Sequence, residues 1–195
     1  GGAFGGNGGG NTAVTRQAAE IARQVGRPVK VVWSREEDIM HDKQRPPVHT
    51  RLSAVLGDNG LPEAFFSRAV WFTQNAAESI GPATADISIA TMPYQVPNRR
   101  HERHNVAAHI PTATHRGPGV NQNGFIIEQF VDELALAGDW DPLDWRIEMT
   151  KGLEPWQRVL LRLKEVSGFT TDLPVGQGMG VAVVEDHGAY CDACA

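Results

Sequence analysis

The fold class is decided by residues 124–146, which read GFIIEQFVDELALAGDWDPLDWR. Apolar residues recur at helical spacing from Gly124 to Ala137 and predict a helix with a wide apolar face. Asp141 can cap a second helix, and Pro142 suits its first turn because the amide that proline lacks would have no partner there. A third helix is predicted to begin at Pro155, so this part of the chain is a helical block.

Strands are predicted on both sides of this block. Residues 51–56 and 62–72 read as two strands around the sequence Gly57-Asp58-Asn59-Gly60. An Asn-Gly pair tolerates the positive φ angles of a tight turn, which predicts a hairpin. A further buried strand is predicted over residues 178–184.

Another helix is predicted near the N-terminus. Asn11 or Thr12 can cap it, and Gly26 suits its end. Its apolar residues form one stripe that we expect to be buried, namely Val14, Ala18, Ile21, Ala22 and Val25. Residues 29–33 then read as a short, mostly buried strand, and residues 34–38 as a turn or the start of a helix.

The order of these elements predicts an α+β (mixed α/β) fold. We expect one partial domain with a mixed α/β portion over residues 1–115 and a helical portion over residues 116–170. Residues 171–195 are expected to start a further strand region.

The composition excludes several classes of protein. The chain has 195 residues, of which 41% are hydrophobic, and a net charge of -5. This suits one globular domain, or one and a half, but lacks the excess of cations that a nucleic-acid binder needs. No apolar stretch approaches the roughly 18 residues that cross a bilayer. The two cysteines, Cys191 and Cys194, are too few for a disulfide-dense scaffold, and their spacing alone predicts no zinc site.

The opening glycines are a first candidate site, because glycine lets backbone amides approach an anion at the start of a helix. Residues 8–13 fit the pattern G-x-G-x-x-A, which is typical of dinucleotide binding. Arg35 follows about where a ribose or 2′-phosphate would be bound. A Rossmann-type NAD(P)-binding domain is therefore one hypothesis, and a flexible linker is another.

A second candidate is Arg116, which lies in the turn sequence THRGPG of residues 114–119. A stiff turn can present the guanidinium to an anionic ligand, although an ordinary solvated turn has the same sequence pattern. The basic stretch 98–104 is interpreted as a solvated edge strand whose charge Glu102 offsets. The seven histidines show no spacing typical of a metal site.

An ordered set of motifs covers nearly the whole chain. It consists of GAFGG at 2–6, GRPVKVVWSREED at 26–38, RP at 45–46, YQVPN at 94–98, RGPG at 116–119, NGF at 123–125, Glu128, DELA at 132–135 and DPLDWR at 141–146. Together these motifs resemble the molybdopterin-binding (large) subunit of the xanthine dehydrogenase and aldehyde oxidase family. The details are most similar to the isoquinoline 1-oxidoreductase large-subunit branch.

The resemblance implies a molybdenum hydroxylase that oxidises an aldehyde or an N-heterocyclic carbon with water as the oxygen source. The implied cofactor is molybdenum–molybdopterin, with a cytosine dinucleotide form as an option. In this family the pterin dithiolene holds the metal, so no side-chain ligand is required. Electrons are expected to leave through iron–sulfur clusters on a partner subunit.

Matching positions in the motifs imply which residues serve the site. The expected cofactor-binding residues are Gly2, Ala3, Phe4, Gly5, Gly6, Arg116 and Gly117. The backbone of Phe4 and Gly5 would lie beside the molybdenum, and Gly8 and Pro118 would line the substrate pocket. Purine oxidisers carry larger or charged residues at Gly8, Pro118 and Ala85, so the resemblance implies a smaller or less polar substrate.

The general-base glutamate of the family falls outside this sequence, which opens with GGAFGGNGGG and stops without a polar tail. We therefore expect a fragment of a longer protein with no catalytic residue of its own. Alone, it is expected neither to turn over substrate nor to retain the cofactor. The Rossmann-type domain and a non-catalytic interaction domain are the alternatives.

Overall fold

The computed structural model describes residues 13–73, 92–107, 109–112, 117, 119–186 and 189–194. Their elements are, in chain order, α1 (Ala13–Val25), α2 (Arg35–His41), β1 (Val48–Leu56), β2 (Pro62–Thr73), β3 (Asn98–Ala107), α5 (Val120–Ala137), α6 (Pro142–Met149), α7 (Glu154–Ser167), β4 (Val181–Asp186) and β5 (Ala189–Cys194). The mixture of helices and strands confirms the predicted α+β class.

β1 and β2 form the predicted antiparallel hairpin. Its turn is closed by the amide of Gly57, which donates to the carbonyl oxygen of Leu61 at 2.9 Å. The side-chain oxygen of Asn59 accepts from the amide of Leu61 at 3.0 Å. Gly60 has a φ of +74°, which glycine adopts without steric cost, so the Asn-Gly pair forms the turn for the expected physical reason.

β3 completes this sheet by pairing with β2 in the parallel direction, in the order β1-β2-β3. It carries the basic stretch of the sequence. The carboxylate of Glu102 binds Arg68 of β2 at 2.7 Å and Arg100 at 2.6 Å. The predicted charged edge strand is therefore confirmed, and its exposed charges disfavour pairing with another sheet.

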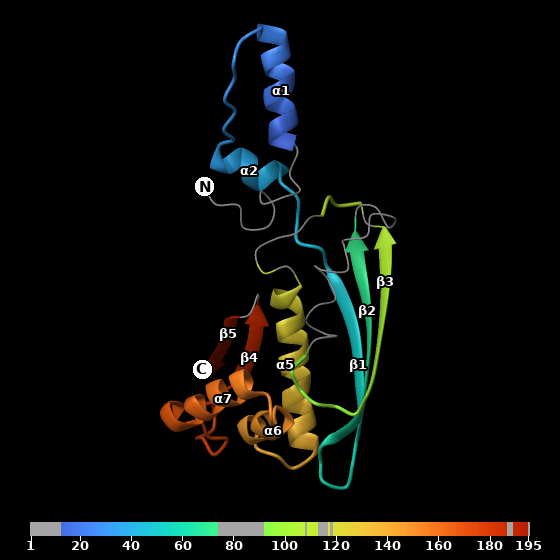
Figure 1. Ribbon diagram of the computed structural model, residues 1–195, viewed down its shortest axis with the longest axis vertical. Helices are drawn as coiled ribbons and strands as arrows, with labels where there is room; N and C mark the ends of the chain where they lie inside the picture. The colour runs from blue at the N-terminus through green and yellow to red at the C-terminus, as the bar shows by residue number, and fades with distance from the viewer. Residues whose placement is uncertain are drawn as a thin grey trace.

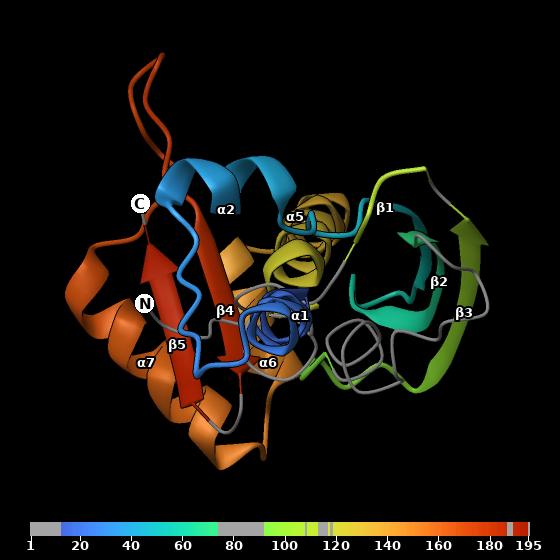
Figure 2. The same cartoon turned by 90° about the horizontal axis from the view of Figure 1, so that it is seen from above.

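α5 lies between the three-stranded sheet and the β4–β5 pair, α6 packs at the C-terminal end of α5, and α7 lies beside α6 and β5 (Figures 1 and 2). Both sheets and these three helices contribute to one core. Its large members are Phe65 and Trp71 of β2, Tyr94, Ile127, Val131 and Leu134 of α5, Leu143 and Trp145 of α6, Leu160 and Leu163 of α7, and Val181 and Val183 of β4. The apolar face of the central helix therefore organises both halves of this core.

α5 begins at Val120 rather than at Gly124, where the sequence pattern places its start. Gly119, with a φ of +77°, precedes the first turn. Gly124 lies inside the helix, at a point where β4 comes close. A Cβ atom at this position would lie 3.0 Å from Cγ1 of Val184, so the glycine marks a close contact and not a helix boundary.

The remaining helical predictions are confirmed. Asp141 caps α6, since its side chain accepts from the amides of Leu143 at 2.9 Å and Asp144 at 3.0 Å. α7 ends at Gly168, whose φ is +64°. No helix among the described residues combines the length and the apolarity that crossing a bilayer requires.

Two predictions near the N-terminus are wrong. The sequence predicts a buried apolar stripe on α1, but no residue of this helix is buried. Residues 29–33 are extended but form no strand, because no other strand pairs with them in the described part of the chain. The segment after them does form a helix, and the hydroxyl oxygen of its cap Ser34 accepts from the amide of Glu37 at 3.1 Å.

The backbone just after α5, at Gly138, lies against the backbone of the β1–β2 turn at Gly60. The indole nitrogen of Trp140 donates to the carbonyl oxygen of Asn59 at 3.0 Å, and a Cβ atom on Gly138 would lie only 2.1 Å from the carbonyl oxygen of Gly60. We expect Gly138→Ala to lower the free energy of unfolding by about 1–3 kcal/mol, because neither backbone can move aside freely. Urea denaturation measures the change.

The matched control is Gly178→Ala, where an added Cβ meets no atom within 4 Å. This variant should change the free energy of unfolding by less than about 0.5 kcal/mol. Equal stability of the two variants would show that the contact between α5 and the turn is not tight.

Candidate cofactor-binding groove

A groove of about 850 Å³ runs between α5 and β4. Residues of α5 between Val120 and Asp132 line one side, and the other side is lined, at and beside β4, by Gly180, Val181, Ala182 and Val184. Arg45 and Gly117 also line it. Since Gly117 precedes the first turn of α5, these two residues lie at the end of the groove that is near the helix N-terminus.

Arg45 links the start of α5 to the segment before β1. One of its terminal nitrogens, Nη1, lies 3.3 Å from the carbonyl oxygen of Gly117 and 3.2 Å from the side-chain oxygen of Gln122, and donates to both. The side-chain amide of Gln122 in turn donates to the carbonyl oxygen of Pro46 at 3.2 Å. These reciprocal contacts form a clasp, which we define as Arg45, Pro46, Gly117 and Gln122.

The same segment also binds residues 111–112. The amide of Gln44 donates to the carbonyl oxygen of Pro111 at 2.8 Å, and Gln44 forms a parallel β-bridge with Thr112. Residues 111–112 and Gly117 flank residues 113–116 in the sequence. The described residues on both sides of that stretch are therefore anchored to residues 44–46, next to the groove.

The clasp end of the groove is electropositive. Partial burial lowers the pKa of the Arg45 guanidinium, but its ordinary pKa is so high that it stays charged at neutral pH. The N-terminus of α5 has no side-chain cap at Gly119, so the partial positive charge of its first turn is not neutralised there. A cation and a helix N-terminus together favour an anionic group at this end.

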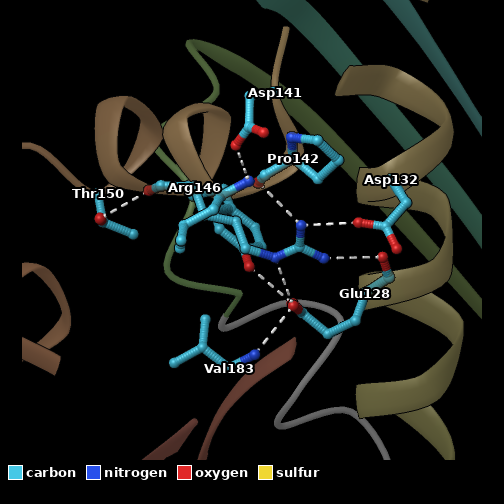
Figure 3. Close-up of polar contacts among 9 residues, drawn as sticks. Glu128, Asp132, Asp141, Pro142, Arg146, Thr150 and Val183 are labelled. Atoms are coloured by element: carbon cyan, nitrogen blue, oxygen red, sulfur yellow. Dashed lines mark hydrogen bonds and ion pairs between the residues drawn. The ribbon is translucent and has the colours of Figure 1, made fainter. Parts of the chain in front are cut away.

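The carboxylate of Glu128 lines the groove further along α5 and belongs to a buried ion cluster (Figure 3). Nε of Arg146 lies 2.9 Å from Glu128 and Nη1 lies 2.7 Å from Asp132. Glu128 also accepts from the hydroxyl of Tyr94 at 2.7 Å and from the amide of Val183 at 3.0 Å. The cluster thus joins α5, α6, β4 and the segment before β3.

Burial and the pairing of charges oppose each other in this cluster. Burial raises the pKa of Glu128, although Arg146 and the hydroxyl of Tyr94 oppose this shift. It also raises the pKa of Tyr94 well above its usual value, with Glu128 adding to the effect. Burial alone would lower the pKa of Arg146, but Tyr94, Glu128 and Asp132 together raise it. Arg146 is therefore a permanent cation to which both carboxylates are bound.

Among the described residues, no three or more His, Cys, Asp or Glu side chains come together in a way that could hold a metal ion.

Of the residues that the sequence predicts for the site, Gly117 lies at the groove, with a φ of +66°. The other predicted residues, which are Gly2, Ala3, Phe4, Gly5, Gly6, Gly8, Arg116 and Pro118, lie outside the described residues. The convergence of the two glycine turns on one pocket therefore stays a prediction. Sequence reasoning misses Gln122 and the clasp, because no spacing rule connects Arg45 and Pro46 with residues more than seventy positions later in the chain.

The ion cluster makes a direct prediction for stability. Arg146→Met leaves Glu128 buried without its cation, and we expect the free energy of unfolding to fall by about 3–5 kcal/mol. Arg162→Met removes an exposed pair with Glu165 and should cost less than about 1 kcal/mol. Guanidinium denaturation of both variants measures the difference, and similar losses would contradict the burial argument.

The clasp makes a prediction for local opening. Arg45→Lys keeps the charge but not the guanidinium fork, so it should lose a charged hydrogen bond and let the amides of residues 109–112 and 117–123 exchange about tenfold faster. Arg51→Lys, at an exposed position of β1, is the control. Hydrogen exchange with mass spectrometry measures both. Unchanged exchange in the Arg45 variant would show that the clasp does not hold these described residues in place.

Comparison with known proteins places this geometry in a family. The family model of the molybdopterin cofactor-binding domain matches residues 1–149. The chain is 34% identical over 149 residues to a probable xanthine dehydrogenase subunit of Bacillus subtilis (strain 168), with 75% of this chain and 20% of that protein covered. It is 26% identical over 186 residues to the beta subunit of isoquinoline 1-oxidoreductase of Brevundimonas diminuta, with 89% and 24% covered.

Solved structures show the same fold at lower identity. The aldehyde oxidoreductase of Desulfovibrio gigas aligns with a TM-score of 0.70 at 19% identity, covering 92% of this chain and 22% of that one. The CO dehydrogenase of Oligotropha carboxidovorans aligns with a TM-score of 0.72 at 17% identity, covering 87% and 24%.

This chain therefore spans about a fifth to a quarter of the length of the relatives that it matches. The match agrees with the resemblance found in the sequence motifs and decides against the Rossmann-type alternative. The chain belongs to the molybdopterin cofactor-binding domain family.

Proposed function

We propose that this chain forms one wall of a molybdenum–molybdopterin site in an oxidoreductase of the hydroxylase type. The observation that carries the proposal is the anchoring of residues 111–112 and Gly117, which flank residues 113–116 in the chain, to residues 44–46 beside the groove. The sequence motifs assign Arg116, within that stretch, to the cofactor as a cation. Fixed flanking residues are what a rigid binding site requires.

The described residues fit such a cofactor at the clasp end of the groove. Arg45 supplies a fixed cation, and the N-terminus of α5 supplies a positive dipole end. Both suit an anionic, electron-rich group. Further along the groove, Glu128 and Asp132 do not repel it strongly, because Arg146 binds both carboxylates. Arg45 and the N-terminus of α5 therefore favour binding of the cofactor at the clasp end of the groove only.

Several residues of this chain would contact the cofactor or the substrate. The backbone amides of Gly2, Ala3, Phe4, Gly5 and Gly6 would face the cofactor from one side, with Arg116 and Gly117 on the other. When bound, the cofactor supplies a molybdenum centre that accepts electrons from the substrate. Gly8 and Pro118 would shape the substrate pocket, and their small side chains suit an aldehyde or an N-heterocycle.

The complete reaction needs parts beyond this chain. The relatives include proteins named as subunits, which supports a partner that carries iron–sulfur clusters and removes the electrons. The general-base glutamate implied by the motifs is not in this sequence. The isolated chain is therefore expected to be inactive and to release the cofactor, which could have the cytosine dinucleotide form.

Metal content tests this proposal. In the longer natural polypeptide that contains this chain, Gly117→Val should reduce molybdenum per polypeptide at least about tenfold, because a branched side chain cannot adopt the left-handed backbone at the loop base. Elemental analysis by mass spectrometry measures the metal.

Gly176→Val is the control, because Gly176 also has a positive φ, +91°, but lies outside the groove lining. This variant should retain the metal. The proposal is refuted if Gly117→Val retains it too while remaining folded, or if the isolated chain of 195 residues binds molybdenum stoichiometrically.

A further inference from the structure

The turn between β1 and β2 contains a chemically reactive pair of residues, Asn59 and Gly60. In an Asn-Gly pair the backbone nitrogen of the glycine can attack Cγ of the asparagine side chain, because glycine has no Cβ atom to hinder the approach. Asn59 is exposed, so water also reaches it. The pair is therefore a candidate site of spontaneous deamidation.

The reaction balances with water as its co-reactant. A bond forms between the nitrogen of Gly60, which loses its proton, and Cγ of Asn59, and the carboxamide nitrogen leaves as ammonia. Water then hydrolyses the resulting cyclic imide. Opening at one carbonyl gives aspartate, and opening at the other gives isoaspartate, in which the main chain runs through the former side chain.

The fold requires both residues of this pair. Gly60 has a φ of +74°, and a Cβ atom at this position would lie 2.2 Å from the carbonyl oxygen of Gly138. The side-chain oxygen of Asn59 accepts from the amide of Leu61 at 3.0 Å, which helps to close the turn. The residues that form the turn are therefore the same residues that make it reactive.

Hydrogen bonds hold both reacting groups in place. The amide of Gly60, which supplies the attacking nitrogen, donates to the carbonyl oxygen of Gly57 at 3.0 Å. The carboxamide of Asn59 is held by Leu61, and the backbone carbonyl oxygen of Asn59 accepts from the indole nitrogen of Trp140 at 3.0 Å. Ring closure consumes the N–H of Gly60 and needs the two groups aligned, so these hydrogen bonds oppose it.

Trp140 connects the turn to a distant part of the chain. It follows α5, and its backbone amide donates to the carbonyl oxygen of Ala135 at 2.8 Å, so the residue is fixed to the end of that helix. A local separation of the helix end from the turn would break the indole hydrogen bond without unfolding the core. The reaction at Asn59 should therefore follow this local opening.

We propose that Asn59 is a deamidation site of this chain, that the contact between Trp140 and the turn sets the rate, and that isoaspartate formed there weakens the same contact. The other Asn-Gly pairs of the sequence are different cases. Asn123 is fully buried inside α5, where burial and the helical backbone hinder ring closure, and Asn7 lies outside the described residues. The proposal does not depend on cofactor binding.

Peptide mapping by mass spectrometry after incubation at neutral pH tests the rate. Trp140→Phe keeps an aromatic ring but removes the indole donor, so deamidation at Asn59 should become about fivefold faster. Trp33→Phe is the matched control, because it removes an indole hydrogen bond to Gln17. Gln17 belongs to α1, which lies at the opposite end of the molecule from the β1–β2 turn, so this variant should leave the rate at Asn59 unchanged (Figure 1).

Deamidation at Asn123 in the same samples separates local opening from global unfolding. If the rates at Asn59 and Asn123 rise together in Trp140→Phe, the variant acts by unfolding the whole chain and the proposal is overturned. An unchanged rate at Asn59 in this variant would also overturn it. So would an intact Asn59 in the folded variant under conditions in which the urea-unfolded chain reacts there.

The two products should differ in their effect on the fold. Aspartate keeps the main chain and an oxygen acceptor for the amide of Leu61, so Asn59→Asp should shift the Tm by less than about 2 °C. Isoaspartate adds a methylene group to the main chain beside the tight contact of Gly60 with Gly138, so the isoaspartate form, separated by chromatography, should lose about 4 °C or more. Equal Tm values for the two proteins would overturn the proposed weakening of the contact.

Discussion

The described structure depends on one buried guanidinium. Arg146 is fully buried, and it reaches Glu128 and Asp132 on α5 while its own backbone belongs to α6. Glu128 then accepts from the amide of Val183, which fixes β4 against the same helix. Because an unpaired charge cannot stay buried, these elements must assemble together. The groove exists because α5 and β4 are held at this separation.

The second constraint is the clasp around Arg45. It ties Arg45 to Gly117, and the neighbouring amide of Gln44 binds the carbonyl oxygen of Pro111, so the described residues on both sides of residues 113–116 are anchored to one short segment before β1. The ion cluster and the clasp act at different points along α5. Together they hold α5 beside a groove that has one electropositive end.

Turn and capping patterns in the sequence predict those elements that neighbouring residues determine. The hairpin follows from the turn at Asn59 and Gly60, and α6 begins where Asp141 caps it. These patterns fail where contacts between residues far apart in the sequence determine the local structure. Gly124 looks like a helix boundary because its role, the close approach of β4, is invisible in the sequence. Residues 29–33 have the composition of a strand but pair with no strand in the described part of the chain. The clasp escapes prediction for the same reason, since it joins positions far apart in the chain. The predicted turns around Phe4 and Arg116 stay predictions.

A double-mutant cycle on Arg146 and Glu128 tests the central claim most directly. The free energy of unfolding is measured for Arg146→Met, for Glu128→Gln and for the double variant. If the pair joins α5, α6 and β4 as a unit, the double variant should lose less free energy of unfolding than the two single variants lose in total, by about 2 kcal/mol or more. Additive losses, within about 0.5 kcal/mol, would show that the two residues act separately and would contradict the account.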